Sequence, residues 1–151
     1  MSYTAESGRR QILDDVAAGI DDLGEALSAL SDAYELLDEQ TADAMEGQLF
    51  APLQAAYGQL KRTHVEFAAR HGLPGREFPP AALAHPVGPR ATIDRATGAV
   101  ARVDERLATL QDSMLPVEVG DQELRAGLAR VRSLLDPFEG RASQLIRTLG
   151  R

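Results

Sequence analysis

The sequence predicts an all-α fold, namely an antiparallel four-helix bundle in up-down-up-down order with heptad-like seams in its core. First, apolar residues recur in alternating steps of three and four along four long segments, which is the spacing of one helix face. Second, aromatic residues make up only 5% of the chain, so aliphatic residues must form the core. Third, stretches rich in proline and glycine separate the segments.

A chain of 151 residues with 44% hydrophobic content is long enough for one domain, residues 1–151, with a sizeable core. The predicted helices cover about residues 7–38, 42–71, 89–114 and 121–149, and a loop covers 72–88. The seams leave open whether one chain closes the bundle or two helical hairpins complete it in a homodimer.

The first predicted helix, about 7–38, carries an unbroken seam. Its apolar positions follow the steps 3, 4, 3, 4, 3, 4, 3: Leu13, Val16, Ile20, Leu23, Leu27, Leu30, Tyr34 and Leu37. A seam of this kind indicates packing along other helices. Beyond Leu37 the heptad positions are Thr41, Ala44 and Gln48, so the seam ends and we expect a turn at about 38–41.

The second predicted helix, about 42–71, contains a proline. Its stripe consists of Phe50, Leu53, Tyr57, Leu60, His64, Phe67 and His71. Pro52 removes one backbone hydrogen bond, so we expect a kink near Gln48. The alternative is that the helix begins at Pro52 after a break at 47–51. We favour the kink because it makes the first two helices similar in length.

The connection from Gly72 to Pro89 holds five prolines and three glycines. It is too long for a tight turn between neighbouring helices, where about 2–8 residues are usual. Its apolar residues predict that part of it packs on the bundle, across either the end or the side: Leu73, Phe78, Leu83 and Val87.

The last two predicted helices begin with clear signals. Pro89 suits the first position of the helix at 89–114, and Asp121 is a candidate N-cap for the helix at 121–149. Pro137 falls inside the last helix and should kink it. Their stripes are Ile93, Ala96, Val100, Val103, Leu107, Leu110 and Met114, then Leu124, Leu128, Val131, Leu135, Phe138, Ala142, Leu145 and Leu149.

The composition excludes several classes of function. The net charge is −7, and an acidic chain is a poor binder of nucleic acid because phosphate contacts need a basic surface. The chain has no cysteine, which excludes disulfides and thiolate sites. No apolar stretch reaches the length of a membrane span, and the N-terminus lacks a signal-peptide core. We therefore expect a cytoplasmic protein with no nucleic-acid or membrane partner.

Motifs for catalysis are absent from the sequence. No Glu-x-x-His, His-Glu-x-x-His, phosphate-binding glycine loop or Gly-x-Ser-x-Gly occurs. We therefore expect no enzyme activity, no cofactor and no dedicated metal site.

Tyr57, His64 and His71 form an unusual polar series, spaced by seven on one helical stripe. Buried polar groups need partners. The simpler interpretation is that they lie at the stripe edge and meet water, a backbone carbonyl or an acidic side chain. The alternative is a pocket for a small ligand or metal near Gly72, with carboxylates supplied by other helices.

The first helix is strongly acidic, with ten carboxylates against two arginines in residues 5–40. Five of its carboxylates lie off the seam and form a candidate interaction face: Asp14, Asp21, Asp22, Glu25 and Asp32. We therefore predict a non-enzymatic interaction protein, either a small adaptor or an oligomeric scaffold. Its partner would be an unidentified protein or a second copy of the chain.

Overall fold

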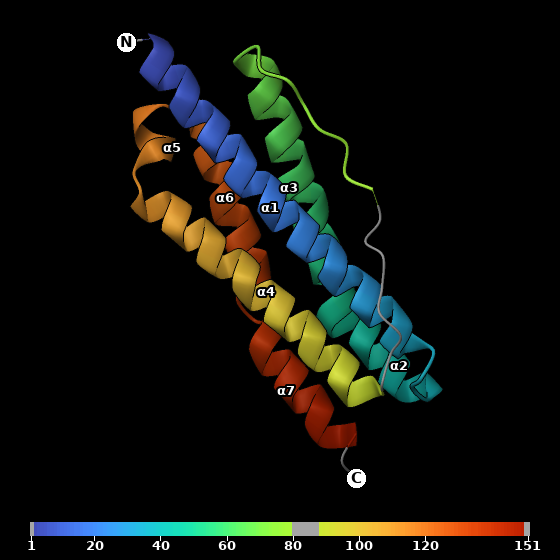
Figure 1. Cartoon of the computed structure of the whole chain (residues 1–151). Coiled ribbons are helices and arrows are strands. Elements are labelled where there is room, and N and C mark those ends of the chain that lie inside the picture. Colours follow the sequence, from blue (N-terminus) through green and yellow to red (C-terminus); the bar gives the residue numbers. More distant parts are fainter. Residues whose placement is uncertain (1, 80–87, 150–151) are drawn as a thin grey trace.

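The computed structural model describes residues 2–79 and 88–149. Within these ranges all regular secondary structure is helical (Figure 1), so the predicted all-α class is confirmed. None of these helices is long and apolar enough to cross a membrane. In chain order the elements are α1 (Ser2–Tyr34), α2 (Glu39–Met45), the π-helix η1 (Glu46–Phe50), α3 (Ala51–Arg70), α4 (Pro89–Asp112), α5 (Leu115–Glu118), α6 (Gln122–Leu135) and α7 (Phe138–Leu149).

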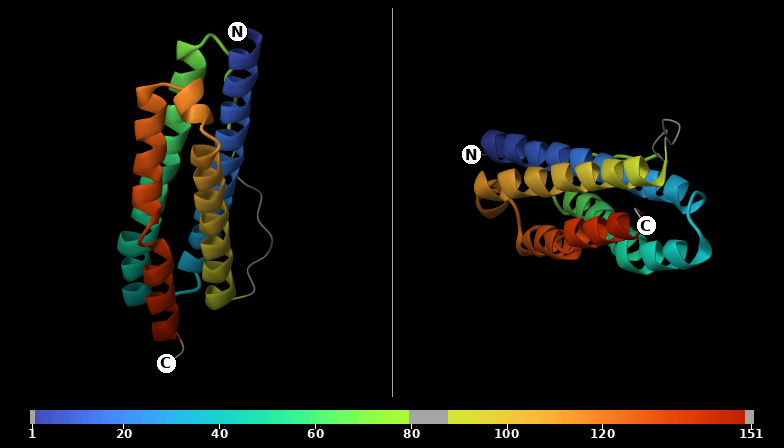
Figure 2. Two further views of the ribbon diagram at one scale, coloured as in Figure 1. Left: turned by 90° about the vertical axis from the view of Figure 1, so that its left-hand side faces the viewer. Right: turned by 90° about the horizontal axis from the view of Figure 1, so that it is seen from below.

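Helix α1 packs against both α3 and α4 (Figures 1 and 2). Its buried face starts on the predicted seam, with Val16, Ile20 and Leu23 inaccessible to solvent. Towards its C-terminus the buried face moves to Ala29 and Ala33, whereas Tyr34 is 43% exposed. The predicted burial of Tyr34 on the seam is wrong, because a helix of 3.6 residues per turn drifts by about 20° per heptad.

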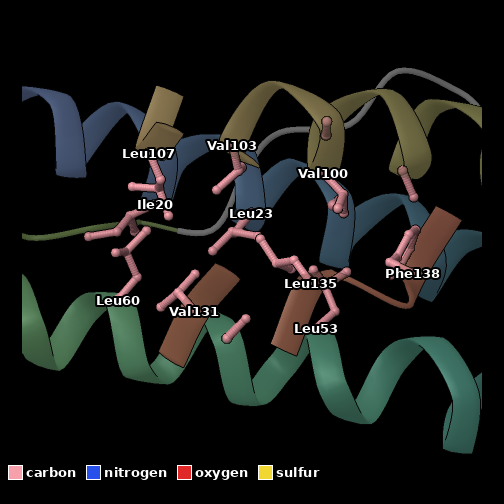
Figure 3. Close-up of a cluster of buried hydrophobic side chains, with 14 of the residues drawn as sticks. Ile20, Leu23, Leu53, Leu60, Val100, Val103, Leu107, Val131, Leu135 and Phe138 are labelled. Atoms are coloured by element: carbon pink, nitrogen blue, oxygen red, sulfur yellow. The ribbon is translucent and has the colours of Figure 1, made fainter. Parts of the chain in front are cut away.

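Side chains from five helices meet in the core. Figure 3 shows apolar side chains of α1, α3, α4, α6 and α7 directed towards one another. The labelled residues are Ile20, Leu23, Leu53, Leu60, Val100, Val103, Leu107, Val131, Leu135 and Phe138. All are buried, and each fully buried side chain of this size contributes about 1.5–3 kcal/mol relative to exposure.

The helix directions differ from the prediction. Gly19 lies beside Leu60 and Gly24 beside Tyr57, so α3 runs opposite to α1. Helix α4 also runs opposite to α1, because Asp22 lies near Arg106 and Glu25 lies near Arg102. Helices α3 and α4 are therefore parallel to each other (Figure 1), and the predicted up-down-up-down order is wrong.

The connection between α3 and α4 explains this order. The end of α3 and the start of α4 lie at opposite ends of the molecule (Figure 1). A chain of about 18 residues reaches roughly 60 Å, which exceeds the roughly 36 Å of a 24-residue helix. A connection of this length can therefore span the distance between the two ends.

We name residues 72–79 the strap. The Leu73 amide in the strap donates a hydrogen bond to the Ala68 carbonyl over 2.9 Å. The side chains of Leu73 and Phe78 are partly buried against the core. The strap contains no helix or strand. Residues 80–87, including the predicted packing residues Leu83 and Val87, lie outside the described residues.

The first turn comes earlier than predicted. Helix α1 ends at Tyr34, and α2 begins at Glu39, against expected bounds of about 38 and 42. The Asp38 carboxylate accepts a hydrogen bond from the Thr41 amide over 2.8 Å and caps α2. This local capping bond, which the apolar pattern does not reveal, determines where α2 starts.

Pro52 disturbs the helix at the predicted place. The π-helix η1 ends directly before α3, and Ala51 donates to the carbonyl of Glu46. The helix stays continuous through 47–51, so the alternative break is wrong. Pro52 cannot donate to Gln48; instead the Arg141 guanidinium of α7 donates to the Gln48 carbonyl over 3.2 Å.

The second half of the chain is more divided than predicted. Helix α4 ends at Asp112, and Met114 has a left-handed φ of 68° before the short α5. The predicted helix at 121–149 is two helices, α6 and α7, separated at Pro137. Asp121 is confirmed as the N-cap of α6, since its side chain accepts from the Leu124 amide. Pro137 has no backbone N–H to donate, which is a local cause of the break between α6 and α7.

Helices α3 and α6 approach closely at Gly127. A Cβ at this position would overlap the Thr63 hydroxyl and lie 3.0 Å from the Thr63 methyl group. Thr63 is buried and β-branched, so it has few alternative rotamers. Glycine at 127 therefore sets the distance between the two helices.

We expect Gly127→Ala to lower the free energy of unfolding by about 1–3 kcal/mol through overpacking, measured by urea unfolding. Gly140→Ala in α7 is the matched control, because its Cβ would meet no atom within 4 Å. The control should raise stability by about 0.5–1 kcal/mol through helix propensity. Equal effects of both substitutions would contradict the close approach at Gly127.

Candidate functional site

His64 lies in the core beneath the strap. It is 3% exposed, and its ring meets the Phe78 ring edge-to-face with centroids 5.2 Å apart. Its Nδ1 is enclosed and has no hydrogen-bond partner among the described residues. Burial lowers the pKa of His64, as does the charge of Arg76, while the Leu13 backbone and the charge of Asp14 act in the opposite direction.

An open groove of about 640 Å³ lies beside His64, between α1 and the strap. Its charged lining residues are Arg10, Asp14 and Asp21 of α1 and Arg76 of the strap. Of the three polar residues on the α3 stripe, only His64 lines this groove.

His71 has an acidic partner on another helix. Its Nε2 lies 3.0 Å from Asp121 Oδ2. Arg70 donates to both oxygens of the same carboxylate over 2.8 Å. Burial alone would raise the pKa of Asp121, but hydrogen bonds from Arg70, the Leu124 amide and His71 lower it from 3.8 to about 2. This cluster joins the end of α3 to the start of α6.

Tyr57 occupies a third environment. Its half-buried ring faces Gly24 of α1, where a Cβ would lie 3.7 Å from its Cε1. The Lys61 ammonium lies 5.0 Å from the ring centroid, within cation–π range. Tyr57, His64 and His71 thus face three separate environments. Among the described side chains, no group of three or more His, Asp or Glu residues is arranged to hold a metal ion.

Three residues of the predicted acidic face pair with arginines of the same chain. Asp21 accepts from Arg76 of the strap over 2.9 Å. On the α4 side, Asp22 accepts from Arg106 over 2.8 Å, and Glu25 from Arg102 over 3.1 Å. Arg102 also lies 3.7 Å from Asp22.

The other two residues of that face, Asp14 and Asp32, form no ion pair within the described parts of the chain. The five carboxylates therefore do not form one uniform surface, because the middle three already have internal cationic partners.

A second acidic surface surrounds the turn between α1 and α2. We name residues 32–46 the acidic corner. It holds six carboxylates and no lysine or arginine: Asp32, Glu35, Asp38, Glu39, Asp43 and Glu46. Hydrogen bonding to the Thr41 backbone lowers the pKa of Asp38. Tyr34 and Leu36, which belong to this corner, are 43% and 47% exposed.

Sequence reasoning missed most of this surface. The seam assigned Tyr34 to the interior, so the exposure of this side chain at the corner was not expected. The run of carboxylates without a basic residue from 32 to 46 is visible in the sequence and is the signal that identifies the corner.

Comparisons with protein-family models, with curated proteins and with solved structures found no match for this chain. Its function is therefore inferred from the side chains and surfaces described above.

Asp121→Asn tests the charged contacts at the start of α6. A carboxylate whose pKa is lowered in the folded state stabilises the fold at pH values above its ordinary pKa. This stabilisation is lost as the pH falls from about 4 through about 2. At pH 7 we expect the free energy of unfolding of Asp121→Asn to be about 1–2 kcal/mol lower than that of wild type, allowing for solvent screening. The difference should close near pH 2, measured by urea unfolding at each pH.

Asparagine keeps a capping oxygen, so the pH-dependent part of the difference reports the charge of Asp121. Asp43→Asn, at an exposed carboxylate of α2 that forms no ion pair within the described residues, is the matched control and should change the unfolding free energy at pH 7 by less than about 0.5 kcal/mol. A difference for Asp121→Asn that stays constant down to pH 2 would contradict the lowered pKa.

Asp22→Asn tests the pairing between α1 and α4. Its side chain is 14% exposed between two arginines, so we expect a loss of about 1 kcal/mol in unfolding free energy. Asp14→Asn, with no ion pair in the described structure, should stay within about 0.5 kcal/mol of wild type. A double-mutant cycle of Asp22→Asn with Arg106→Met measures the coupling directly, and a value of zero would show that the pair contributes nothing.

Proposed function

We propose that this protein is a non-enzymatic four-helix bundle of the cytoplasm that acts in protein–protein interaction, as a small adaptor or scaffold. The acidic corner is the observation that carries the proposal. It combines six carboxylates with two large apolar side chains, Tyr34 and Leu36, that are 43% and 47% exposed. Exposed apolar side chains within a charged rim are typical of interaction surfaces.

The contacts between helices support the bundle. Helix α1 packs on α3 and α4, α3 packs on α6, and α4 packs on α7 and to a smaller extent on α6. In this arrangement α2, η1 and α3 together serve as the second helix of the bundle, and α6 with α7 as the fourth. Bundles with a long crossover connection between two parallel helices are an established variant of this architecture.

The charge of the corner indicates the partner. A protein surface with lysine or arginine around an apolar centre would be attracted to it, and complementary charge accelerates association. An isologous contact between two copies would instead bring the same carboxylates face to face. We therefore propose a basic protein partner at this corner rather than a second copy of the chain.

The flank of α1 is a weaker candidate. A partner that docks on Asp21, Asp22 or Glu25 would have to displace arginines that already bind these carboxylates. The carboxylates of the acidic corner form no ion pair within the described residues, so a partner there has no internal cation to displace.

Charge reversal of the corner tests the proposal. The variant Asp43→Lys with Glu46→Lys changes two exposed residues of α2 and η1. The matched control, Glu66→Lys with Glu105→Lys, makes the same charge change on exposed positions of α3 and α4. Immobilised wild type should retain a basic protein from cell extract, and retention should fall at least about tenfold for the corner variant.

The control variant should retain the partner as wild type does, and added salt should weaken the retention by screening. Unfolding midpoints of all variants confirm that the fold is intact. Equal loss for both variants, or no partner specific to wild type, would contradict the proposal. Light scattering of the purified protein should show a monomer, and a dimer that the corner variant abolishes would favour a second copy as the partner.

A further inference from the structure

The strap is held on α1 and α3 by a chain of side-chain contacts. Arg76 donates to Asp21 of α1 over 2.9 Å. The Arg76 guanidinium also lies 5.0 Å from the centroid of the Phe78 ring. Phe78 in turn meets the His64 ring of α3 edge-to-face. One cation and one aromatic ring therefore connect the strap to both helices.

His64 is the buried end of this chain of contacts. It is 3% exposed, and its enclosed Nδ1 has no hydrogen-bond partner in the described structure. A neutral imidazole tolerates this position, because one buried lone pair without a donor costs little compared with a buried ion. A protonated imidazole would carry an N–H at Nδ1 with no acceptor, which is far more costly.

The charged groups around His64 do not compensate for a proton. The groove beside it is lined by Arg10, Asp14 and Asp21 on α1 and by Arg76 on the strap. The two arginines balance the two carboxylates, and Asp21 is already bound to Arg76. Arg76 disfavours a second positive charge at His64, whereas Asp14 favours it.

We propose that the strap is a pH-sensitive cover over His64, closed while the imidazole is neutral and released when the imidazole takes up a proton. Release removes Phe78 from the ring and lets Nδ1–H reach water. It also frees Asp21 from Arg76 and widens the groove along α1. The switch therefore joins protonation of one core residue to the exposure of a surface segment.

The direction of the pH dependence follows from linkage. With the strap open, His64 is solvated and takes an ordinary pKa of about 6.5. With the strap closed, burial lowers the pKa. The open form binds the proton more strongly, so opening is favoured as pH falls below about 6.5 and is independent of pH well above it. Between pH 7.5 and 5.5 the equilibrium constant for opening should rise by up to about tenfold.

Two measurements test the switch. In wild type, proton NMR follows the contact between the His64 and Phe78 rings, which should weaken from pH 7.5 to 5.5. In Phe78→Trp the new side chain is the only tryptophan, so its quenching by acrylamide reports strap opening and should increase over the same range. Circular dichroism at both pH values confirms that the helices stay folded.

His64→Leu in the Phe78→Trp background removes the titrating group and keeps the site apolar. Its quenching should not change with pH, whereas His71→Gln, whose imidazole contacts Asp121 instead, should keep the pH response. An unchanged ring contact in wild type between pH 7.5 and 5.5 would overturn the proposal. So would a pH response of quenching that His64→Leu leaves intact.

Discussion

Burial of α1 between α3 and α4 is the constraint on which the rest of the structure depends. Its buried face includes small residues as well as large ones, with Ala26, Ala29 and Ala33 fully inaccessible. Two neighbouring helices require a broader apolar face than a single coiled-coil seam provides. Because both neighbours run opposite to α1, the chain must return along the length of the molecule before α4, and the strap begins that return.

Charge is distributed so that this packing does not leave one uniformly acidic flank. Arg102 and Arg106 of α4 and Arg76 of the strap bind carboxylates of α1. These contacts are partly exposed, so each adds little stability by itself, but together they pair three carboxylates on this flank of α1 with cations of the same chain. The acidic corner differs from this flank, because its six carboxylates form no ion pair within the described residues and lie beside two exposed apolar side chains.

The sequence was most informative where the cause is local. Pro52 and Pro137 disturb their helices because a missing N–H acts at one position, and Asp121 caps α6 through its own side chain. It was least informative about Tyr34, whose exposure depends on how α1 drifts against two neighbours. Of the polar series, the acidic contact of His71 was among the outcomes expected, whereas the contact of His64 with Phe78 required the path of the strap.

The sequence by itself determined that the chain is helical, where Pro52 and Pro137 disturb the helices, and which residues can form the core, because period, propensity and capping are local properties. Only the tertiary structure decided that α3 and α4 are parallel, because the spacing of apolar residues in a heptad seam does not depend on the direction of the neighbouring helix. It also decided which carboxylates are paired, because Arg76, Arg102 and Arg106 are distant in sequence from α1. Such pairings exist only once the helices are packed side by side.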